Sequence, residues 1–404
     1  MIETQIDVTN ANFKANPFPF YAKLRTEAPV FPVTVPMPTK QRACLITRYS
    51  DVQDVLKDAR FAKNPRNAMS LEQLKKRHWM SQMFKPLEQN MLDLDSPDHT
   101  RLRALVHKAF TPRLIEQMRD EIQALTDELL NAAEPKGSMD LIADFALPLP
   151  LTIIGRILGV PAKDNDKFHS WTKTLLSAGT NMNYVVFIPT IMRFMGYMKK
   201  LIKERRAHPK DDLVTALVQA KDGSDKLSGD EVLAMIFLLL VAGTETTVNL
   251  IGSGSLALLE HPDQLEKLCC EPEIIKPAIE ELLRFVCPVE MATERYACED
   301  ISIAGTTIPR GELVLAVIGS ANRDANYFDN PDTLNLTREH NKHLAFGLGA
   351  HYCLGAPLSR LEGQIAISTL VRRMPNLRLS IPSDQIRWRG GIILRGLEAL
   401  PVSF

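Results

Sequence analysis

The sequence has no excess of charge of either sign. Its 404 residues include 48 lysines and arginines and 48 aspartates and glutamates, so the formal net charge at pH 7 is zero. A protein that binds nucleic acid through its overall charge needs a surplus of cations, which is absent here. We therefore expect small or apolar partners and no nucleic acid.

Cysteine is scarce as well. Only six cysteines occur in the chain, and no two of them have the Cys-x-x-Cys spacing. So few and so dispersed thiols indicate neither a disulfide framework nor a zinc ribbon. Any cysteine with a special role is expected to act singly, and the others to be ordinary thiols.

Targeting and repeat signals are also missing. The amino-terminal stretch MIETQIDVTNANFKANPFPFYAKL has early acids and lacks the basic start and apolar run of a secretory signal, so we expect a cytoplasmic protein. No repeat, low-complexity tract or Ser/Gly-rich linker divides the chain. With 45% hydrophobic residues it can bury a large core, and we expect one domain over residues 1–404.

Hydrophobic periodicity predicts a mainly α fold with a minor β portion. Apolar residues recur every three or four positions over about residues 98–285 and again over 353–373, which is typical of core-facing helices. Short β-like runs broken by Gly and Pro occur at about 30–50, 290–320 and 376–404. The sheet is thus expected to draw strands from both ends of the chain.

One predicted helix is unusually long and apolar. It begins with a Ser-x-x-Glu capping box at Ser228, ends before His261-Pro262, and has Glu245 as its only charge from 232 to 259. Its length and apolar character would also suit a membrane span, but the central AGTETT segment would be costly against lipid, which favours the middle of a soluble core. The threonines there either face a cavity or bond back to the preceding turn.

The segment AFGLGAHYCLGAPLSR, residues 345–360, places Cys353 between glycines at the predicted start of a helix over 354–373. Free amides and the helix dipole favour a thiolate at that position, either as a nucleophile or as a metal ligand. A zinc site lacks a second ligand pair, a dinucleotide loop lacks its third glycine, and a catalytic thiol lacks an obvious base. A catalytic thiol and axial ligation of a haem iron are the two options left open at this point.

Three motifs in order resemble those of the cytochromes P450. The haem-binding signature Phe-Gly-x-Gly-x-His/Arg-x-Cys-x-Gly is matched at Phe346, Gly347, Gly349, His351, Cys353 and Gly355. The Ala-Gly-x-Glu/Asp-Thr-Thr segment is matched at Ala242, Gly243, Glu245, Thr246 and Thr247, and Glu-x-x-Arg at Glu281 and Arg284. The resemblance extends over essentially the whole chain and is greatest to soluble bacterial members related to polyketide and macrolide hydroxylases. Ser359 departs from the family, which commonly has alanine there.

The resemblance implies the cytochrome P450 fold with a long central helix over haem b, and Cys353 as the axial ligand. The haem contacts it implies are His99, Arg103, Arg295, His343 and His351 to the propionates, Phe346, Gly347 and Gly355 around the sulfur, and Ala242 and Gly243 on the central helix. Glu281 and Arg284, with Arg338, are expected to be structural.

Thr246 and Glu245 match the family's acid–alcohol pair, which delivers protons during oxygen chemistry. The resemblance also implies a substrate pocket that includes Met83, Leu239, Ala242, Thr247, Val289, Met291 and Ile393.

The expected activity is insertion of one oxygen atom from O₂ into a C–H bond of a sizeable apolar molecule, such as a polyketide, macrolide, steroid or fatty acid. Electrons must come from a ferredoxin or flavodoxin and its reductase, since the chain has no room for a flavin or nicotinamide module. Such a donor is expected near the cysteine, at Arg101, Lys108 and Arg113. We expect a monomer without a membrane anchor. Two alternatives are a peroxide-driven enzyme and a haem-based ligand or gas binder.

Overall fold

The computed structural model describes residues 6–37, 39–76, 87–176, 184–222 and 225–404. Its α-helices are α1 (Ala11–Ala15), α2 (Phe18–Glu27), α3 (Tyr49–Lys57), α4 (Leu71–Lys76), α5 (Asp98–Ala109), α6 (Pro112–Gln117), α7 (Arg119–Ala133), α8 (Pro148–Ile157), α9 (Asn165–Leu176), α10 (Tyr184–Ala207), α11 (Leu213–Gln219), α12 (Gly229–Glu260), α13 (Pro262–Cys270), α14 (Ile275–Val286), α15 (Ile318–Ala321) and α16 (Ala356–Arg373). Short 3-10 or π turns are η1 (Pro65–Asn67), η3 (Glu134–Lys136), η4 (Leu141–Ala146), η5 (Ala162–Asp164), η7 (Pro272–Ile274), η8 (Gly349–His351) and η9 (Ser383–Gln385). The predicted predominance of helix is confirmed.

The strands form a main sheet and three small ones. The main sheet has the order β1-β2-β10-β7-β3, in which β10 runs parallel to β2 and the other neighbours are antiparallel. Its strands are β1 (Val30–Met37), β2 (Thr39–Ile46), β3 (Phe61–Ala62), β7 (Arg295–Ala297) and β10 (Leu313–Ala316). The others are β4 (Ser138–Asp140) with β11 (Arg378–Leu379) and β12 (Pro401–Ser403), β5 (Lys221–Asp222) with β6 (Asp225–Lys226), and β8 (Ile301–Ile303) with β9 (Thr306–Ile308). The prediction that both ends of the chain supply strands is confirmed.

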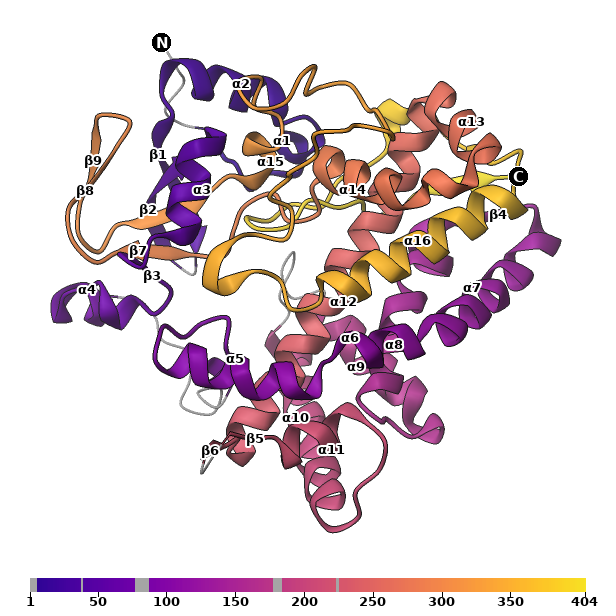
Figure 1. Cartoon of the computed structure of the whole chain (residues 1–404), viewed down its shortest axis with the longest axis horizontal. Coiled ribbons are helices and arrows are strands. Elements are labelled where there is room, and N and C mark those ends of the chain that lie inside the picture. Colours follow the sequence, from indigo (N-terminus) through magenta and orange to yellow (C-terminus); the bar gives the residue numbers. More distant parts are fainter. Residues whose placement is uncertain (1–5, 38, 77–86, 177–183, 223–224) are drawn as a thin grey trace.

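The long apolar helix is α12, at the centre of the helical part (Figure 1). Its capping box is formed as predicted, because the Ser228 hydroxyl accepts from the amide of Glu231 at 3.1 Å and the Glu231 carboxylate accepts from the amide of Ser228 at 2.7 Å. It packs against α8, α10, α14, α16 and η4. Among the described residues α12 alone is long and apolar enough to span a membrane, but 61% of its most apolar stretch is buried in the protein, as in a core helix.

A buried ion-pair network ties α14 to the loop that leads to Cys353. The Arg284 guanidinium donates to both Glu281 oxygens at 2.8 Å, and Arg338 donates to the same carboxylate at 3.1 Å. Glu281 and Arg284 have no exposed surface. Removing one member would strand a buried charge at a cost of about 3–5 kcal/mol. The expected structural role of this trio thus has a clear physical basis.

Candidate functional site

Cys353 lies in a tight turn between η8 and α16. Its amide donates to the carbonyl oxygen of Phe346 at 2.9 Å. Gly349 has φ +73°, and a Cβ at this position would lie 2.9 Å from the carbonyl oxygen of Leu56, so no other residue fits there without a shift. The helix begins at Ala356, two residues later than its sequence pattern predicts, which leaves the thiol just outside its first turn.

The surroundings of the Cys353 sulfur act on its charge in opposite directions. Burial raises the pKa of the thiol, whereas the amides of Gly355 and Ala356 and the guanidinium groups of Arg103 and Arg360 lower it. The amide donors and nearby cations would also stabilise the charge of a metal-bound thiolate. The loop therefore suits a cysteine that binds a metal through sulfur.

A cluster of basic side chains gathers near this turn from four separate parts of the chain. His99 and Arg103 lie on α5, Arg295 on β7, His351 on η8, and Lys63 just after β3. The His99 and His351 ring centroids are 4.2 Å apart. Burial, reinforced by His99 and then Lys63, lowers the pKa of His351 to about 2, and burial lowers the pKa of Arg295 to about 10. Burial and the neighbouring basic groups thus disfavour the charged forms of these side chains. A bound anion would stabilise the charged forms.

Two buried nitrogens of this cluster indicate which kind of anion would bind there. His99 Nε2 and Arg295 Nε are buried and have no hydrogen-bond partner among the residues that the structure describes. Buried polar atoms without partners are rare in folded proteins, and arginine can only donate. A ligand with acceptor oxygens would satisfy both, and the two carboxylates of a haem are such oxygens. With Cys353 close in the sequence to His351, the residues present fit a haem bound by its iron and by its propionates.

Lys63 also belongs to this cluster, and no sequence motif singles it out. Its amine donates to Thr293 Oγ1 at 2.6 Å and to the carbonyl oxygen of Glu294 at 2.7 Å. Burial, and next the charge of Arg295, lowers its pKa to about 8. The lysine follows β3, whose pairing with β7 brings it beside Arg295, and only the folded sheet reveals this contact.

His343 contacts an acidic side chain of α14. Its Nε2 lies 3.1 Å from Glu280, whose carboxylate also accepts two bonds from Arg360 at 2.7 and 2.8 Å. The Arg360 guanidinium lies 4.4 Å from the centroid of Phe346. His343 therefore helps to hold the Phe346 side of the cysteine loop, and its predicted contact with a propionate has no support in these distances.

The acid–alcohol pair on α12 is engaged in local contacts. Thr246 Oγ1 donates to the carbonyl oxygen of Ala242 at 2.7 Å, which is the back-bonded alternative that the sequence left open. The Glu245 carboxylate lies 3.4 Å from Arg389, and burial raises its pKa while Arg389 lowers it. Ala242 is exposed midway along the helix, and its neighbours Val241 and Gly243 are partly exposed. Arg389 was not predicted, since it lies 144 residues away from Glu245.

A second acid lies on the α16 side of α12. Glu362 is 1% exposed, and burial raises its pKa to about 8, while the Thr247 hydroxyl acts in the opposite direction. The same hydroxyl lies 3.3 Å from the hydroxyl of Ser359. Ser359, the departure from the usual family sequence, thus takes part in a polar contact between the two helices. Glu362 stays protonated near neutral pH.

The predicted pocket residues are only partly brought together. Leu239 is buried on α12, whereas Val289 and Ile393 are partly exposed. The amide of Met291 donates to the carbonyl oxygen of Ile393 at 3.1 Å, so these two segments meet. Met291 itself has no exposed surface and belongs to a core cluster with residues of the main sheet, so its place in the pocket stays a prediction. The predicted Met83 lies outside the described residues.

The cations expected to meet an electron donor are largely neutralised. Arg101 makes an ion pair with Glu231, and Lys108 pairs with Asp222 at 2.9 Å. Arg113 is exposed. Lys108 faces solvent as expected, but carboxylates of α12 and of the β5–β6 hairpin pair with Arg101 and Lys108, which reduces the positive charge that this surface offers; the donor site there stays a prediction.

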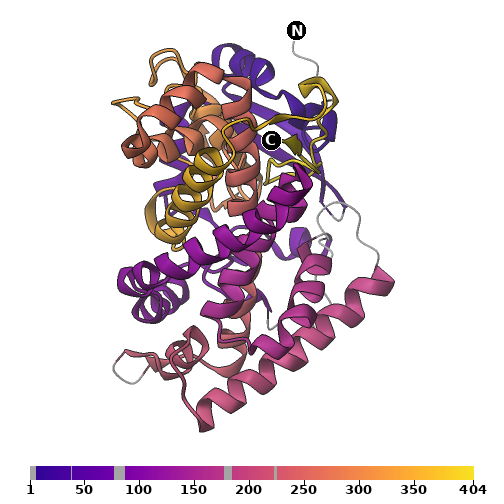
Figure 2. The ribbon, with the colours of Figure 1, turned by 90° about the vertical axis from the view of Figure 1, so that its right-hand side faces the viewer.

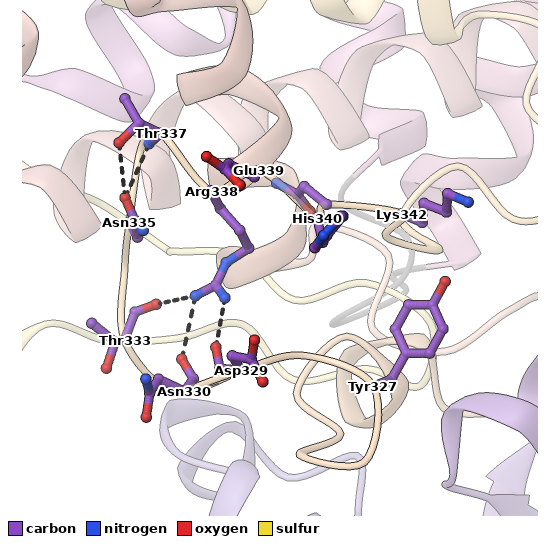
Figure 3. Close-up of a pocket in the computed structure, with 11 residues that line it drawn as sticks. Tyr327, Asp329, Asn330, Thr333, Asn335, Thr337, Arg338, Glu339, His340 and Lys342 are labelled. Atoms are coloured by element: carbon purple, nitrogen blue, oxygen red, sulfur yellow. Dashed lines mark hydrogen bonds between the residues drawn. The ribbon is translucent and has the colours of Figure 1, made fainter.

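A surface hollow lies in the loop of residues 327–342 (Figure 3). Arg338 extends into it and donates to the backbone carbonyls of Asp329, Asn330 and Thr333 at 2.6, 3.3 and 3.0 Å. The hollow contains none of the predicted site residues. The hydrogen bonds of Arg338 to these carbonyls stabilise the conformation of the loop.

Comparison with known proteins identifies the family. The sequence profile of the cytochrome P450 family matches residues 9–386. The polyketide biosynthesis cytochrome P450 PksS of Bacillus subtilis (strain 168) is 45% identical over 398 residues, covering 97% of this chain and 96% of that protein. The solved structure of PksS superposes with a TM-score of 0.91 at 43% identity, covering 99% of each chain.

Two further relatives show the range of molecules handled by similar chains. Vitamin D(3) 25-hydroxylase of Pseudonocardia autotrophica is 40% identical over 402 residues, covering 99% of this chain and 96% of that protein. The structure of P450BioI in complex with hexadec-9Z-enoic acid ligated acyl carrier protein has a TM-score of 0.87 at 39% identity, covering 98% of this chain and 100% of that one. The chain belongs to the cytochrome P450 family and is a monooxygenase, in a family that uses O₂ at a haem held by a cysteine thiolate.

Proposed function

We propose that Cys353 binds the iron of haem b, and that the enzyme hydroxylates a long apolar acyl or polyketide chain at an unactivated C–H bond. The observation that carries the haem site is a pair of buried nitrogens, His99 Nε2 and Arg295 Nε, which have no partner in the described part of the chain. The overall conversion takes one C–H bond, O₂, two electrons and two protons to an alcohol and water. The haem supplies oxygen activation, in which the thiolate promotes cleavage of the O–O bond.

The chain's own residues bind the cofactor and supply protons. His99, Arg295 and His351 would bind the propionates by donating hydrogen bonds to them, and Arg103 lies at the edge of this basic cluster. The Glu245 carboxyl, whose pKa burial raises, can hold a proton, and Thr246 Oγ1 can pass it on after leaving the Ala242 carbonyl. Partial burial of both groups on α12 limits access of bulk water.

Substrate class and supply are inferred from the relatives. The similarity to PksS, to the vitamin D hydroxylase and to the acyl-carrier-bound P450BioI supports a large apolar substrate. We infer that this substrate is an acyl or polyketide chain presented on a carrier protein. Electrons are supplied by a ferredoxin or flavodoxin with its reductase, and this donor binds on the cysteine side. The enzyme acts as a monomer in the cytoplasm.

A peroxide-driven enzyme is the second candidate. One observation favours it: Thr246 is bonded to Ala242 and Glu245 lies against Arg389, so neither group is free to relay a proton in this conformation. A peroxide-driven reaction would not need that relay.

The test of the haem assignment is the spectrum of the reduced protein with carbon monoxide. The parent protein should show the red-shifted band of thiolate ligation, and Cys353→Ala should abolish it. Cys269→Ala and Cys270→Ala serve as controls, since both thiols are exposed. A thiolate band that persists in Cys353→Ala, or is lost in a control, would assign the ligand elsewhere.

A further inference from the structure

The cations of this neutral chain are unevenly distributed. Between Asp166 and Glu204 the sequence has no acidic residue at all, but six basic ones: Lys167, Lys173, Arg193, Lys199, Lys200 and Lys203. Most of this stretch forms α9 and α10. A strongly positive region in a chain of zero net charge has to be offset elsewhere, so the surface is polarised.

The cations of α10 share one exposed face with apolar residues. This face, called the basic face below, consists of Val185, Val186, Met192, Arg193, Gly196, Lys199, Lys200 and Lys203, all exposed. Val185, Val186 and Met192 are 82%, 50% and 51% exposed, which is unusual for such side chains. A Cβ at Gly196 would meet no atom of the described residues within 4 Å, so the face is open at this position.

The positive charges of the basic face are not neutralised internally. No ion pair among the described residues involves Arg193, Lys199, Lys200 or Lys203. The nearest acid in sequence, Glu204, is occupied by Arg205 at 2.8 Å and Lys210 at 3.5 Å. This differs from α5, where Arg101 and Lys108 both have carboxylate partners.

The basic face lies away from the expected route of electrons. Phe194 of α10 contacts Phe237 in the amino-terminal half of α12, with ring centroids 6.0 Å apart. The helix α16, which follows Cys353, packs on the carboxyl-terminal half, where a Cβ at Gly363 would lie 2.9 Å from Leu250. In Figure 2, α10 runs along the lower right of the molecule and α16 lies on the upper left. An electron donor at the cysteine loop would leave the basic face free.

We propose that the basic face of α10 is the docking surface for an acidic carrier protein that presents the acyl substrate. The proposal rests on the function proposed above and adds the place at which the carrier binds. Apolar side chains beside a row of unpaired cations match the usual composition of a protein interface, with an apolar contact and a charged rim. Complementary charge would speed the encounter and orient the carrier.

The experiment measures the affinity of a fluorescently labelled acyl carrier protein loaded with a hexadecanoyl chain, by anisotropy, at low and high salt. The test variant carries R193E, K199E, K200E and K203E. The matched control carries K23E, K136E, K276E and R372E, four exposed cations that likewise have no ion pair among the described residues. Both variants change the net charge equally, so only the location differs.

At low salt the test variant should bind the loaded carrier at least about tenfold more weakly than the parent, and the control should match the parent. The difference should shrink at high salt, where charges are screened within a few ångströms. Free hexadecanoic acid should shift the haem spectrum equally in all three proteins.

Three results would overturn the docking surface: a parent protein that does not bind the loaded carrier, equal weakening in both variants, or a test variant that binds normally. Binding of the parent to phosphatidylglycerol vesicles without binding to the carrier would assign the face to a membrane surface and would also overturn it. A parent that lacks the thiolate band with carbon monoxide would instead refute the proposed function, so the two failures can be told apart.

Discussion

Glu362 allows a quantitative prediction about pH and stability. Burial raises its pKa from 4.5 to about 8 in the folded protein. Between these pH values the folded protein keeps a proton that the unfolded chain has lost, so the contribution of Glu362 is most favourable below pH 4.5 and is lost as pH rises through about 8. Each tenfold difference in proton affinity is worth about 1.4 kcal/mol, so the total loss is up to about 5 kcal/mol.

The substitution Glu362→Gln removes this titration while keeping a neutral group of similar shape. At pH 5 the variant should unfold near the temperature of the parent. At pH 8 it should be more stable, and with an unfolding entropy of about 2 cal/mol/K per residue the gain of up to about 5 kcal/mol corresponds to roughly 6 °C in Tm.

The assay is the thermal unfolding of the holoprotein at pH 5, 6, 7 and 8, followed by circular dichroism. Glu128→Gln on α7 is the control, since Glu128 is exposed and should give no difference that grows with pH. Parallel pH profiles for Glu362→Gln and the parent would refute the reasoning, because they would mean that Glu362 is ionised in the folded protein.

Two further predictions concern the haem site. Thr246→Ala should bind substrate normally but divert electrons into peroxide or water, with peroxide-supported turnover unaffected; unchanged coupling of electron consumption to product would exclude Thr246 from proton delivery and favour the peroxide-driven alternative. Arg295→Leu should release haem to an apoglobin acceptor at least about 30-fold faster than the parent, since loss of one partner of a buried charge pair costs 2 kcal/mol or more. Arg113→Leu, at an exposed position of α6, should not, and equal release rates in Arg295→Leu and the parent would remove Arg295 from the propionate site.

The features that depend on neighbours in sequence were predicted well. The capping box at Ser228 and the stop at His261 both fall where expected, because the cap is a contact between residues three apart. The Glu281–Arg284 pair is likewise local, within one helical turn. The turn around Cys353 could be anticipated from its glycines, of which Gly349 has a left-handed φ and no room for a side chain.

Contacts between distant segments were predicted poorly. Lys63 reaches the basic cluster through strand pairing across more than 230 residues, and Arg389 meets Glu245 across 144. His343 is only ten residues from Cys353, yet it pairs with Glu280 of another helix. A sequence pattern shows which residue types are available and carries no information on which distant partner reaches them first.

The sequence by itself therefore determined the central helix, the cysteine turn and the class of chemistry, since each follows from residue types at short, fixed spacings. The tertiary structure alone decided which charges are paired and which remain free. Arg101 and Lys108 are paired with carboxylates brought from other segments, whereas the cations on the basic face of α10 make no ion pair among the described residues. Glu362 became a neutral acid only because two helices bury it, and burial is a property of the assembled core.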